Sequence, residues 1–132
     1  MKYVIAQYNS LNPFNNTSIP IGVVLQDESG LHVKFDTSKD RLAKIQSIAS
    51  QIDPETFASF AKSFEESFVK APYIEISDDN GNKIQIKSND PKFLDYLKST
   101  YQTFYQFSEP KEIEGTNAAE YLDLLYKNYI LP

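Results

Sequence analysis

Apolar positions along this chain follow two different periods, and each period predicts one kind of element. Short runs rich in β-branched and aromatic residues predict five strands, at Tyr3–Tyr8, Ile19–Leu25, Leu31–Phe35, Tyr73–Ile76 and Lys83–Ile86. Turn-forming residues stand near Gly30 and at Asn80-Gly81, between paired runs, so we expect two hairpins, and the first three strands, which follow one another along the chain, predict a meander. The second run is apolar at nearly every position, which predicts burial on both faces and a central place in the sheet.

Apolar residues spaced three and four positions apart predict four helices, at about Ser38–Ser50, Glu55–Val69, Lys92–Gln106 and Ala118–Tyr129. The last helix begins after Asn117, which with Glu120 resembles a capping box. The second helix has the clearest pattern, a row of four aromatic side chains: Phe57, Phe60, Phe64 and Phe68. We expect that row to lie across the sheet.

Together these elements predict a single α+β domain over residues 1–132. We expect an antiparallel sheet of about five strands, built from the two hairpins and the N-terminal strand, with about four helices packed on one face. A length of 132 residues is typical of one domain, and 41% hydrophobic residues are enough for a buried core. No internal repeat or shift in composition divides the chain.

Charge and cysteine content exclude some classes of site. The chain carries 18 acidic and 13 basic residues, a net charge of −5, which makes binding to nucleic-acid phosphates unlikely. It has no cysteine, so thiolate nucleophiles and cysteine-bound metals are excluded. No apolar run approaches the roughly 20 residues of a membrane span. We therefore expect a cytoplasmic protein that makes no contact with a membrane.

No motif of enzyme chemistry is present. His32 is the only histidine, and no GxSxG sequence presents a serine to it. As a lone histidine it is either a general base or, by far the commoner case, a structural residue. Phosphate-binding glycine loops are also missing. We therefore assign no catalytic residue, metal ligand or cofactor, and enzymatic activity stays open with a non-enzyme favoured.

Three acidic residues provide the alternative to this interpretation. If Asp36, Asp40 and Glu75 converge in space, they supply the carboxylates of a metal-dependent hydrolase acting on nucleic acid or nucleotides. The other explanation is local, because acids near a helix start favour the macrodipole. Arg41 stands beside Asp40 and is expected to pair with a surface carboxylate.

The last predicted helix is the candidate interaction surface. Its apolar residues fall on more than one side, and the candidates for contact are Tyr121, Leu124, Tyr126 and Tyr129. Such a helix is either packed into the core from two sides, or docks a protein partner or a second copy of the chain. We therefore predict a non-catalytic protein-interaction or regulatory module, possibly homodimeric.

One resemblance agrees with this prediction. The segment Ile21–Leu25 (IGVVL), the acidic turn Asp27–Gly30 and the Arg41-Leu42 pair follow one another in the first third of the chain. This order resembles small bacterial proteins of unknown function that are encoded beside HipA-like kinases. The resemblance implies a partner or regulatory role and supplies no catalytic residue.

Overall fold

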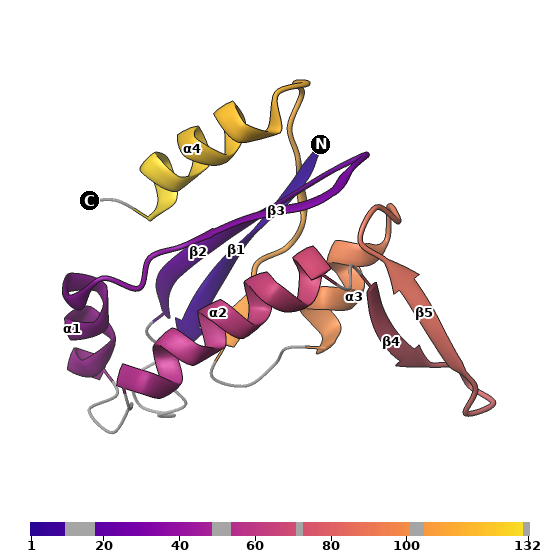
Figure 1. Ribbon diagram of the computed structural model, residues 1–132, viewed down its shortest axis with the longest axis horizontal. Coiled ribbons are helices and arrows are strands. Elements are labelled where there is room, and N and C mark those ends of the chain that lie inside the picture. Colours follow the sequence, from indigo (N-terminus) through magenta and orange to yellow (C-terminus); the bar gives the residue numbers. More distant parts are fainter. Residues whose placement is uncertain (10–17, 49–53, 71–72, 101–104, 131–132) are drawn as a thin grey trace.

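The computed structural model describes residues 1–9, 18–48, 54–70, 73–100 and 105–130 (Figure 1). In chain order the elements are β1 (Lys2–Asn9), β2 (Ser18–Asp27), β3 (Gly30–Phe35), α1 (Lys39–Ile48), α2 (Pro54–Lys70), β4 (Tyr73–Ser77), β5 (Lys83–Lys87), α3 (Phe93–Thr100), β6 (Tyr105–Phe107), β7 (Lys111–Glu112) and α4 (Ala118–Tyr129). This content confirms the predicted α+β class.

The main sheet is antiparallel and has the order β3-β2-β1-β6, with β7 also paired to β1. The first three strands follow one another as the predicted meander. The outer edge of β1 is shared, because β6 pairs with its C-terminal half and β7 with its first residues. Both β1 and β2 are therefore central strands.

Each face of the main sheet has its own core. On β1, Val4, Ala6 and Tyr8 face one cluster, and Tyr3 and Ile5 face the other. On β2 the alternation shifts at Ile21, which has no partner in the β1 ladder because the register slips there. Ile21 and Val24 therefore lie in the first core. Val23 and Leu25 lie in the second core.

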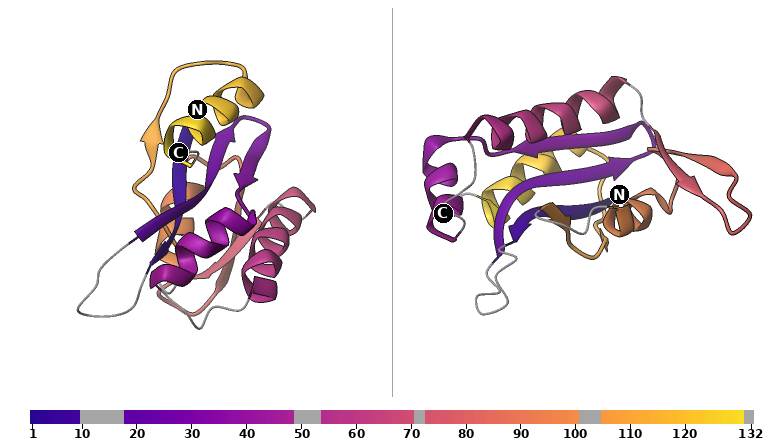
Figure 2. Two further views of the ribbon diagram at one scale, coloured as in Figure 1. Left: turned by 90° about the vertical axis from the view of Figure 1, so that its left-hand side faces the viewer. Right: turned by 90° about the horizontal axis from the view of Figure 1, so that it is seen from below.

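The helices lie on both faces of the sheet, so the prediction that all four pack on one face was wrong. Helices α1, α2 and α3 contribute to the first core, with Ile45, Phe57 and Leu97 among their buried residues. Helix α4 covers the opposite face, as Figure 2 shows. The physical reason is that β1 and β2 are apolar on both faces, and each face needs a cover.

The phenylalanine row of α2 lies on the sheet as predicted. Phe57 and Phe64 are buried, and Phe60 is half-buried against the same core. The ring of Phe64 lies 5.5 Å from those of Phe35 and Phe107, measured between centroids. Phe68 lies outside the residues whose side chains are described.

Two predicted elements have different structures. The helix predicted to run to Gln106 ends as α3 at Thr100, and Tyr105–Phe107 form strand β6 against β1. Residues 101–104, and the predicted end of the first helix at Ser50, lie outside the described residues. The second hairpin, β4–β5, does not join the main sheet but forms a sheet of its own.

Candidate interaction surface

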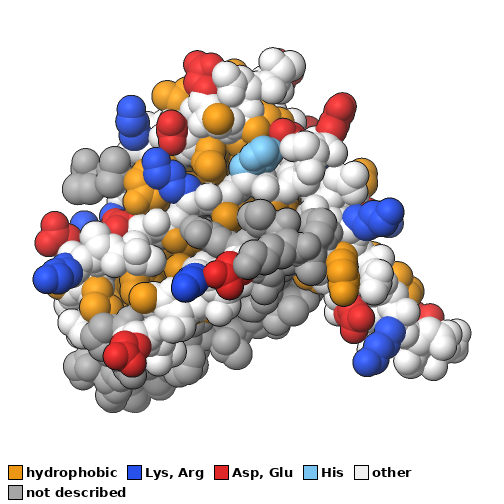
Figure 3. Space-filling view, viewed as in Figure 1, with side chains coloured by type: hydrophobic (Ala, Val, Ile, Leu, Met, Phe, Trp, Pro, Cys, Tyr) orange, Lys and Arg blue, Asp and Glu red, His pale blue; other side chains and the backbone are white. Residues whose placement is uncertain are grey.

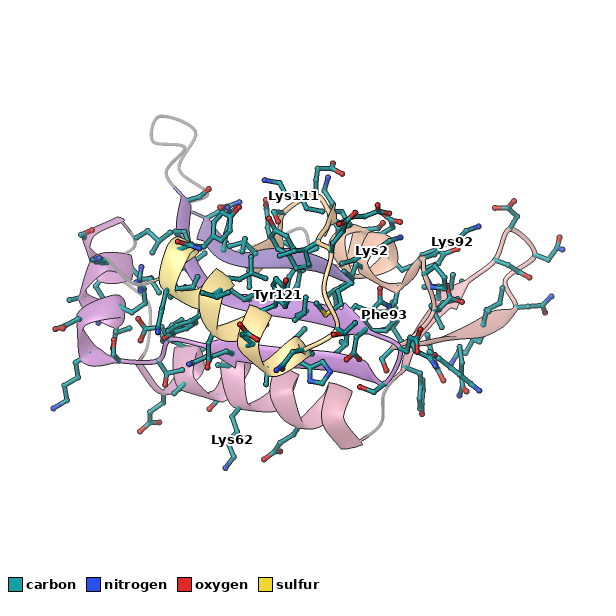
Figure 4. The ribbon with its side chains drawn as sticks, turned by 90° about the horizontal axis from the view of Figure 1, so that it is seen from above. Lys2, Lys62, Lys92, Phe93, Lys111 and Tyr121 are labelled. Atoms are coloured by element: carbon teal, nitrogen blue, oxygen red, sulfur yellow. The ribbon has the colours of Figure 1, made fainter. Side chains whose placement is uncertain are left out.

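Helix α4 presents few of its predicted contact residues to solvent. Tyr126 is buried in the second core, with the Lys34 ammonium 4.6 Å from its ring centroid, so its assignment to a surface was wrong. Tyr121 is half-buried, and its ring lies against Gly115, where no side chain would fit. Figure 4 shows Tyr121 on α4, above the main sheet.

The other two candidates are exposed but separate. Leu124 is 47% exposed, and its helix neighbours Glu120, Lys127 and Asn128 are polar. Tyr129 is 40% exposed, yet its hydroxyl lies 3.1 Å from that of Tyr3. This hydrogen bond, together with burial, raises the pKa of Tyr3 to about 12. Helix α4 therefore mainly covers the second core, and Leu124 is its most exposed large apolar residue, with the half-buried Tyr121 as its apolar neighbour.

The three predicted acids do not form a metal site. The Asp36 carboxylate accepts bonds from the Ser38 backbone N–H at 2.9 Å and from Arg41 Nε at 3.1 Å. Burial opposes its ionisation, but these bonds outweigh that effect and leave the pKa of Asp36 below its ordinary value. Asp36 is thus held in a structural ion pair.

Glu75 lies far from the other two acids, and Asp40 takes no part in the Asp36–Arg41 pair. Asp40 is exposed on α1, and Glu75 is exposed on β4, at opposite ends of the molecule in Figure 1. Within the described residues, no three His, Asp or Glu side chains are placed to hold a metal ion. The geometry therefore supports the helix-start explanation of the acids near α1.

Arg41 is buried, contrary to the expected surface pair. Its side chain is 6% exposed, and its second donor, Nη2, donates to the Ile130 carbonyl after α4. Ser38 caps the start of α1, since its Oγ accepts from the Arg41 backbone N–H at 3.2 Å. Arg41 therefore joins the end of β3, the start of α1 and the end of α4.

His32 takes part in a turn and not in a catalytic triad. In the β2–β3 hairpin its Nε2 lies 3.1 Å from an Asp27 oxygen and 3.2 Å from Ser29 Oγ. A triad requires the acid and the serine on different ring nitrogens, whereas here both contact the same one. The Asp27 carboxylate also accepts from the Ser29 N–H and hydroxyl, as expected of an aspartate in a turn.

An open hollow of about 620 Å³ lies between the N-terminus and the turn after β5. Its wall includes Met1, Lys2, Glu28 and Glu112. The Met1 ammonium donates one hydrogen bond to the Ile113 carbonyl at 3.1 Å, and Lys2 Nζ donates one to the Pro91 carbonyl at 3.0 Å. Figure 4 shows Lys2 near Phe93, close to the root of the second hairpin. Both ammonium groups are therefore held by backbone carbonyls of the wall itself.

The strongest surface feature is the separate two-stranded sheet formed by β4 and β5, here named the ribbon. It projects from one end of the molecule, beyond the main sheet (Figure 1 and Figure 2). Its strands pair from Tyr73↔Lys87 to Ser77↔Lys83. In the described part of the chain, neither strand pairs with any other strand. Such a ribbon is marginally stable unless one face packs on something else.

The loop of the ribbon fixes its register. The Gly81 N–H donates to the Asp78 carbonyl at 3.0 Å, and the Asp78 N–H donates to the Asn82 carbonyl at 2.9 Å. Gly81 has a φ of 80°, which a glycine adopts without strain. The predicted turn is present, as a type I turn followed by a one-residue bulge, and only Gly81 of the Asn80-Gly81 pair has a positive φ. The Asp78 carboxylate accepts from the Asn80 and Asn82 N–H groups and thus completes the turn.

Alternation gives the ribbon two unlike faces. Four isoleucines form two directly opposed pairs on one face: Ile74↔Ile86 and Ile76↔Ile84. Ile74 and Ile86, the pair nearer the main sheet and its helices (the body of the molecule), pack partly against the first core. Farther out, Ile76 is half-buried and Ile84 is 41% exposed. The apolar face thus extends past the body, where Figure 3 shows hydrophobic and charged side chains on the projecting arm.

The root of the ribbon is tied to the main sheet by Gln26. This side chain is buried at the end of β2, and its Nε2 donates to the carbonyls of Ser88 and Asp90, both at 2.7 Å. Asp90 in turn caps α3 through its carboxylate, which accepts from the Lys92 N–H at 2.8 Å. The ribbon therefore leaves the body from a fixed point.

The sequence predicts this hairpin but not that it forms a separate sheet with an exposed apolar end. The signal was the alternation of isoleucine with polar residues in both strands, which predicts one apolar face. That face was assigned to the shared core of a larger sheet. Nothing local in the sequence shows that the hairpin stands apart.

Comparisons with known proteins give no relative. No family model, curated protein or solved structure matches the chain. The resemblance to proteins encoded beside HipA-like kinases therefore stays a prediction. None of the helices in the described residues has both the length and the apolar character needed to cross a membrane.

Proposed function

We propose that this chain is a non-catalytic protein-interaction module and that the ribbon is its contact surface. The observation that carries the proposal is the apolar face of the ribbon, which continues from the core into solvent at Ile84. Apolar side chains placed on a projecting, regular element are a common basis of protein recognition. A regulatory role, as the resemblance implies, follows if the partner is itself an enzyme.

No specific observation favours the hydrolase alternative. Asp36 is neutralised by Arg41. Asp40 is exposed on α1, and Glu75 is exposed on β4 at the other end of the molecule (Figure 1). The possible homodimer belongs to the proposal as one form of interaction. Light scattering over a dilution series measures it directly, since a dimer dissociates on dilution.

A matched pair of variants tests the proposal. Ile84→Lys places a charge on the exposed end of the ribbon, and Leu124→Lys places the same charge at a similarly exposed position of α4. Proteins retained by the immobilised wild-type chain and lost by either variant are identified, purified and titrated against all three forms.

We expect a purified partner to bind Ile84→Lys at least about tenfold more weakly than wild type, a loss of about 1.4 kcal/mol. Binding to Leu124→Lys is expected to be unchanged. The proposal fails if no protein distinguishes the wild type from Ile84→Lys. If Leu124→Lys alone loses the partner, α4 and not the ribbon is the contact surface.

A further inference from the structure

We propose that the ribbon binds an extended strand of a partner protein along the free edge of β5, and that this strand alternates acidic and apolar side chains. The inference rests on the proposed interaction function and specifies the chemistry of the partner. It follows from three features of β5: the direction of its backbone groups, the charge of one face and the apolar residues of the other.

The backbone of β5 is prepared to accept a further strand. Because Asp78 and Asn82 form the closing hydrogen-bonded pair, the pairs Ile76↔Ile84 and Ile74↔Ile86 are hydrogen-bonded in turn. The intervening residues of β5 then direct their N–H and C=O groups outward: Lys83, Gln85 and Lys87. The Lys87 carbonyl accepts from the Asp90 N–H at 3.0 Å. The structure pairs this edge with no other strand in the described residues.

The charge of β5 is unusual for this chain. Lys83 and Lys87 are both exposed and lie on the face opposite the isoleucines. Among the described residues neither ammonium lies within ion-pair distance of a carboxylate. Glu75 is the one acid on this face of the two strands, and it lies on β4 opposite Gln85, so β5 itself presents two lysines and no acid along its free edge.

These features define the sequence of the added strand. Residues directly opposite one another share a face, so positions opposite Lys83 and Lys87 are acidic, and those opposite Ile84 and Ile86 are apolar. The expected pattern is acidic, apolar, any residue, apolar, acidic. Main-chain hydrogen bonds supply affinity in such complexes, and the alternate side chains supply specificity.

A second copy of the chain fits this edge poorly in a symmetric arrangement. Two β5 strands paired antiparallel about Gln85 place Lys83 opposite Lys87 of the other copy at both ends. Two β4 strands paired about Glu75 place like carboxylates together. The free apolar face offers only Ile76 and Ile84, a small part of the roughly 800 Å² per partner that stable complexes bury.

The experiment uses the full chain and two capped heptapeptides, GEVTVEG and its lysine counterpart GKVTVKG. Each is titrated into wild type, into the charge reversal Lys83→Glu with Lys87→Glu, and into a control reversal with equal net charge, Lys44→Glu with Lys127→Glu. Two-dimensional amide NMR follows the binding. At low salt we expect wild type to bind the glutamate peptide about fivefold more tightly than the lysine peptide.

The amide signals should locate the contact. The outward N–H groups of Lys83, Gln85 and Lys87 are expected to shift more than those of Ile84 and Ile86, and the charge reversal should invert the peptide preference. The control reversal should leave the preference as it is. The inference is overturned if both peptides bind alike, if neither binds at millimolar concentration, if the shifts fall elsewhere, or if the reversal has no effect.

Two outcomes separate this inference from the function on which it rests. If the outward amides shift with protein concentration alone, the occupant is a second copy, and only the partner chemistry is wrong. If the peptides fail but a purified partner still requires Ile84, the interaction function stands without the strand mechanism. If the peptides fail and no purified partner requires Ile84, both the strand mechanism and the interaction function are refuted.

Discussion

Replacement of Arg41 by methionine tests whether the ends of β3 and α4 are joined by a buried ion pair. Methionine keeps much of the aliphatic bulk and removes the guanidinium. The Asp36 carboxylate then retains its bonds from Ser38 but loses its counter-charge, and the Ile130 carbonyl loses its donor. Both losses occur where water has little access, since the side chains of Arg41 and Asp36 are 6% and 12% exposed.

The expected magnitude follows from that burial. Removing one partner of a buried pair typically destabilises a protein by about 3–5 kcal/mol, whereas an exposed pair contributes about 0–1 kcal/mol. A domain of this size has roughly 5–15 kcal/mol of stability in total, so the variant should fold but be strongly destabilised. Urea denaturation followed by circular dichroism measures the free energy of unfolding.

Lys98→Met is the matched control. Lys98 pairs with Glu109, but its side chain is 39% exposed and that of Glu109 is 76% exposed. We expect this variant to lose less than about 1 kcal/mol. Equal losses in Arg41→Met and Lys98→Met would refute the argument from burial. Arg41→Lys should fall between wild type and Arg41→Met, because a single ammonium cannot reproduce a guanidinium that bonds two acceptors.

Three further predictions concern pH and single contacts. Because the pKa of Asp36 is lowered in the folded state, the ionised carboxylate stabilises the fold above about pH 4, and this contribution is lost as the pH falls further. The melting temperature of Asp36→Asn should therefore fall less steeply than that of wild type below about pH 4. Tyr129→Phe removes the hydroxyl whose hydrogen bond is the main cause of the raised Tyr3 pKa. An ultraviolet absorbance titration should show the pKa of Tyr3 moving from about 12 toward its ordinary value. Gln26→Leu removes the side-chain donor to the Ser88 carbonyl and one of the two donors to the Asp90 carbonyl, which keeps the Phe93 N–H, and should cost about 1–3 kcal/mol in urea unfolding, with faster hydrogen exchange at the ribbon root.

The parts of the fold that could be predicted are those that depend on neighbouring residues. The turn at Asn80-Gly81, the Asn117 cap and the phenylalanine row of α2 all follow from local chemistry or a repeated spacing, and all are present. The predicted meander of the first three strands is also confirmed. In each case a short stretch of sequence carries enough information by itself.

The errors involve contacts between distant parts of the chain. Three residues, Tyr105–Phe107, pair with β1 from about 100 positions away, and such a short strand leaves little trace beside a strong helical spacing. Likewise, nothing near Arg41 shows that its partner is a carbonyl 89 residues later. The two-sided burial of Ile19–Leu25 was predicted, yet it should also have required a helix on each face of the sheet.

The candidate site was harder to predict than the fold for a related reason. Alternating isoleucines predict an apolar face, but not whether the rest of the chain covers it. Ile74 and Ile86 are partly buried because residues of the first core pack against them. Ile84 is exposed because it lies beyond those residues. Tyr126 of α4 gave the opposite error, since it is buried where α4 covers the second face of the sheet.

The structure of the ribbon links its stability to the binding of a partner. Its root is held by the two bonds from Gln26 and by Ile74 and Ile86, while its outer half has only the β4–β5 ladder and the turn. Two strands alone are marginally stable, and a third strand with an apolar face crosses the threshold for stable folding. On the proposal made above, a strand added to β5 should order the outer half, and a change that loosens the root should weaken binding by up to the free energy that the root loses. Gln26 would then influence binding without lying on the proposed contact surface.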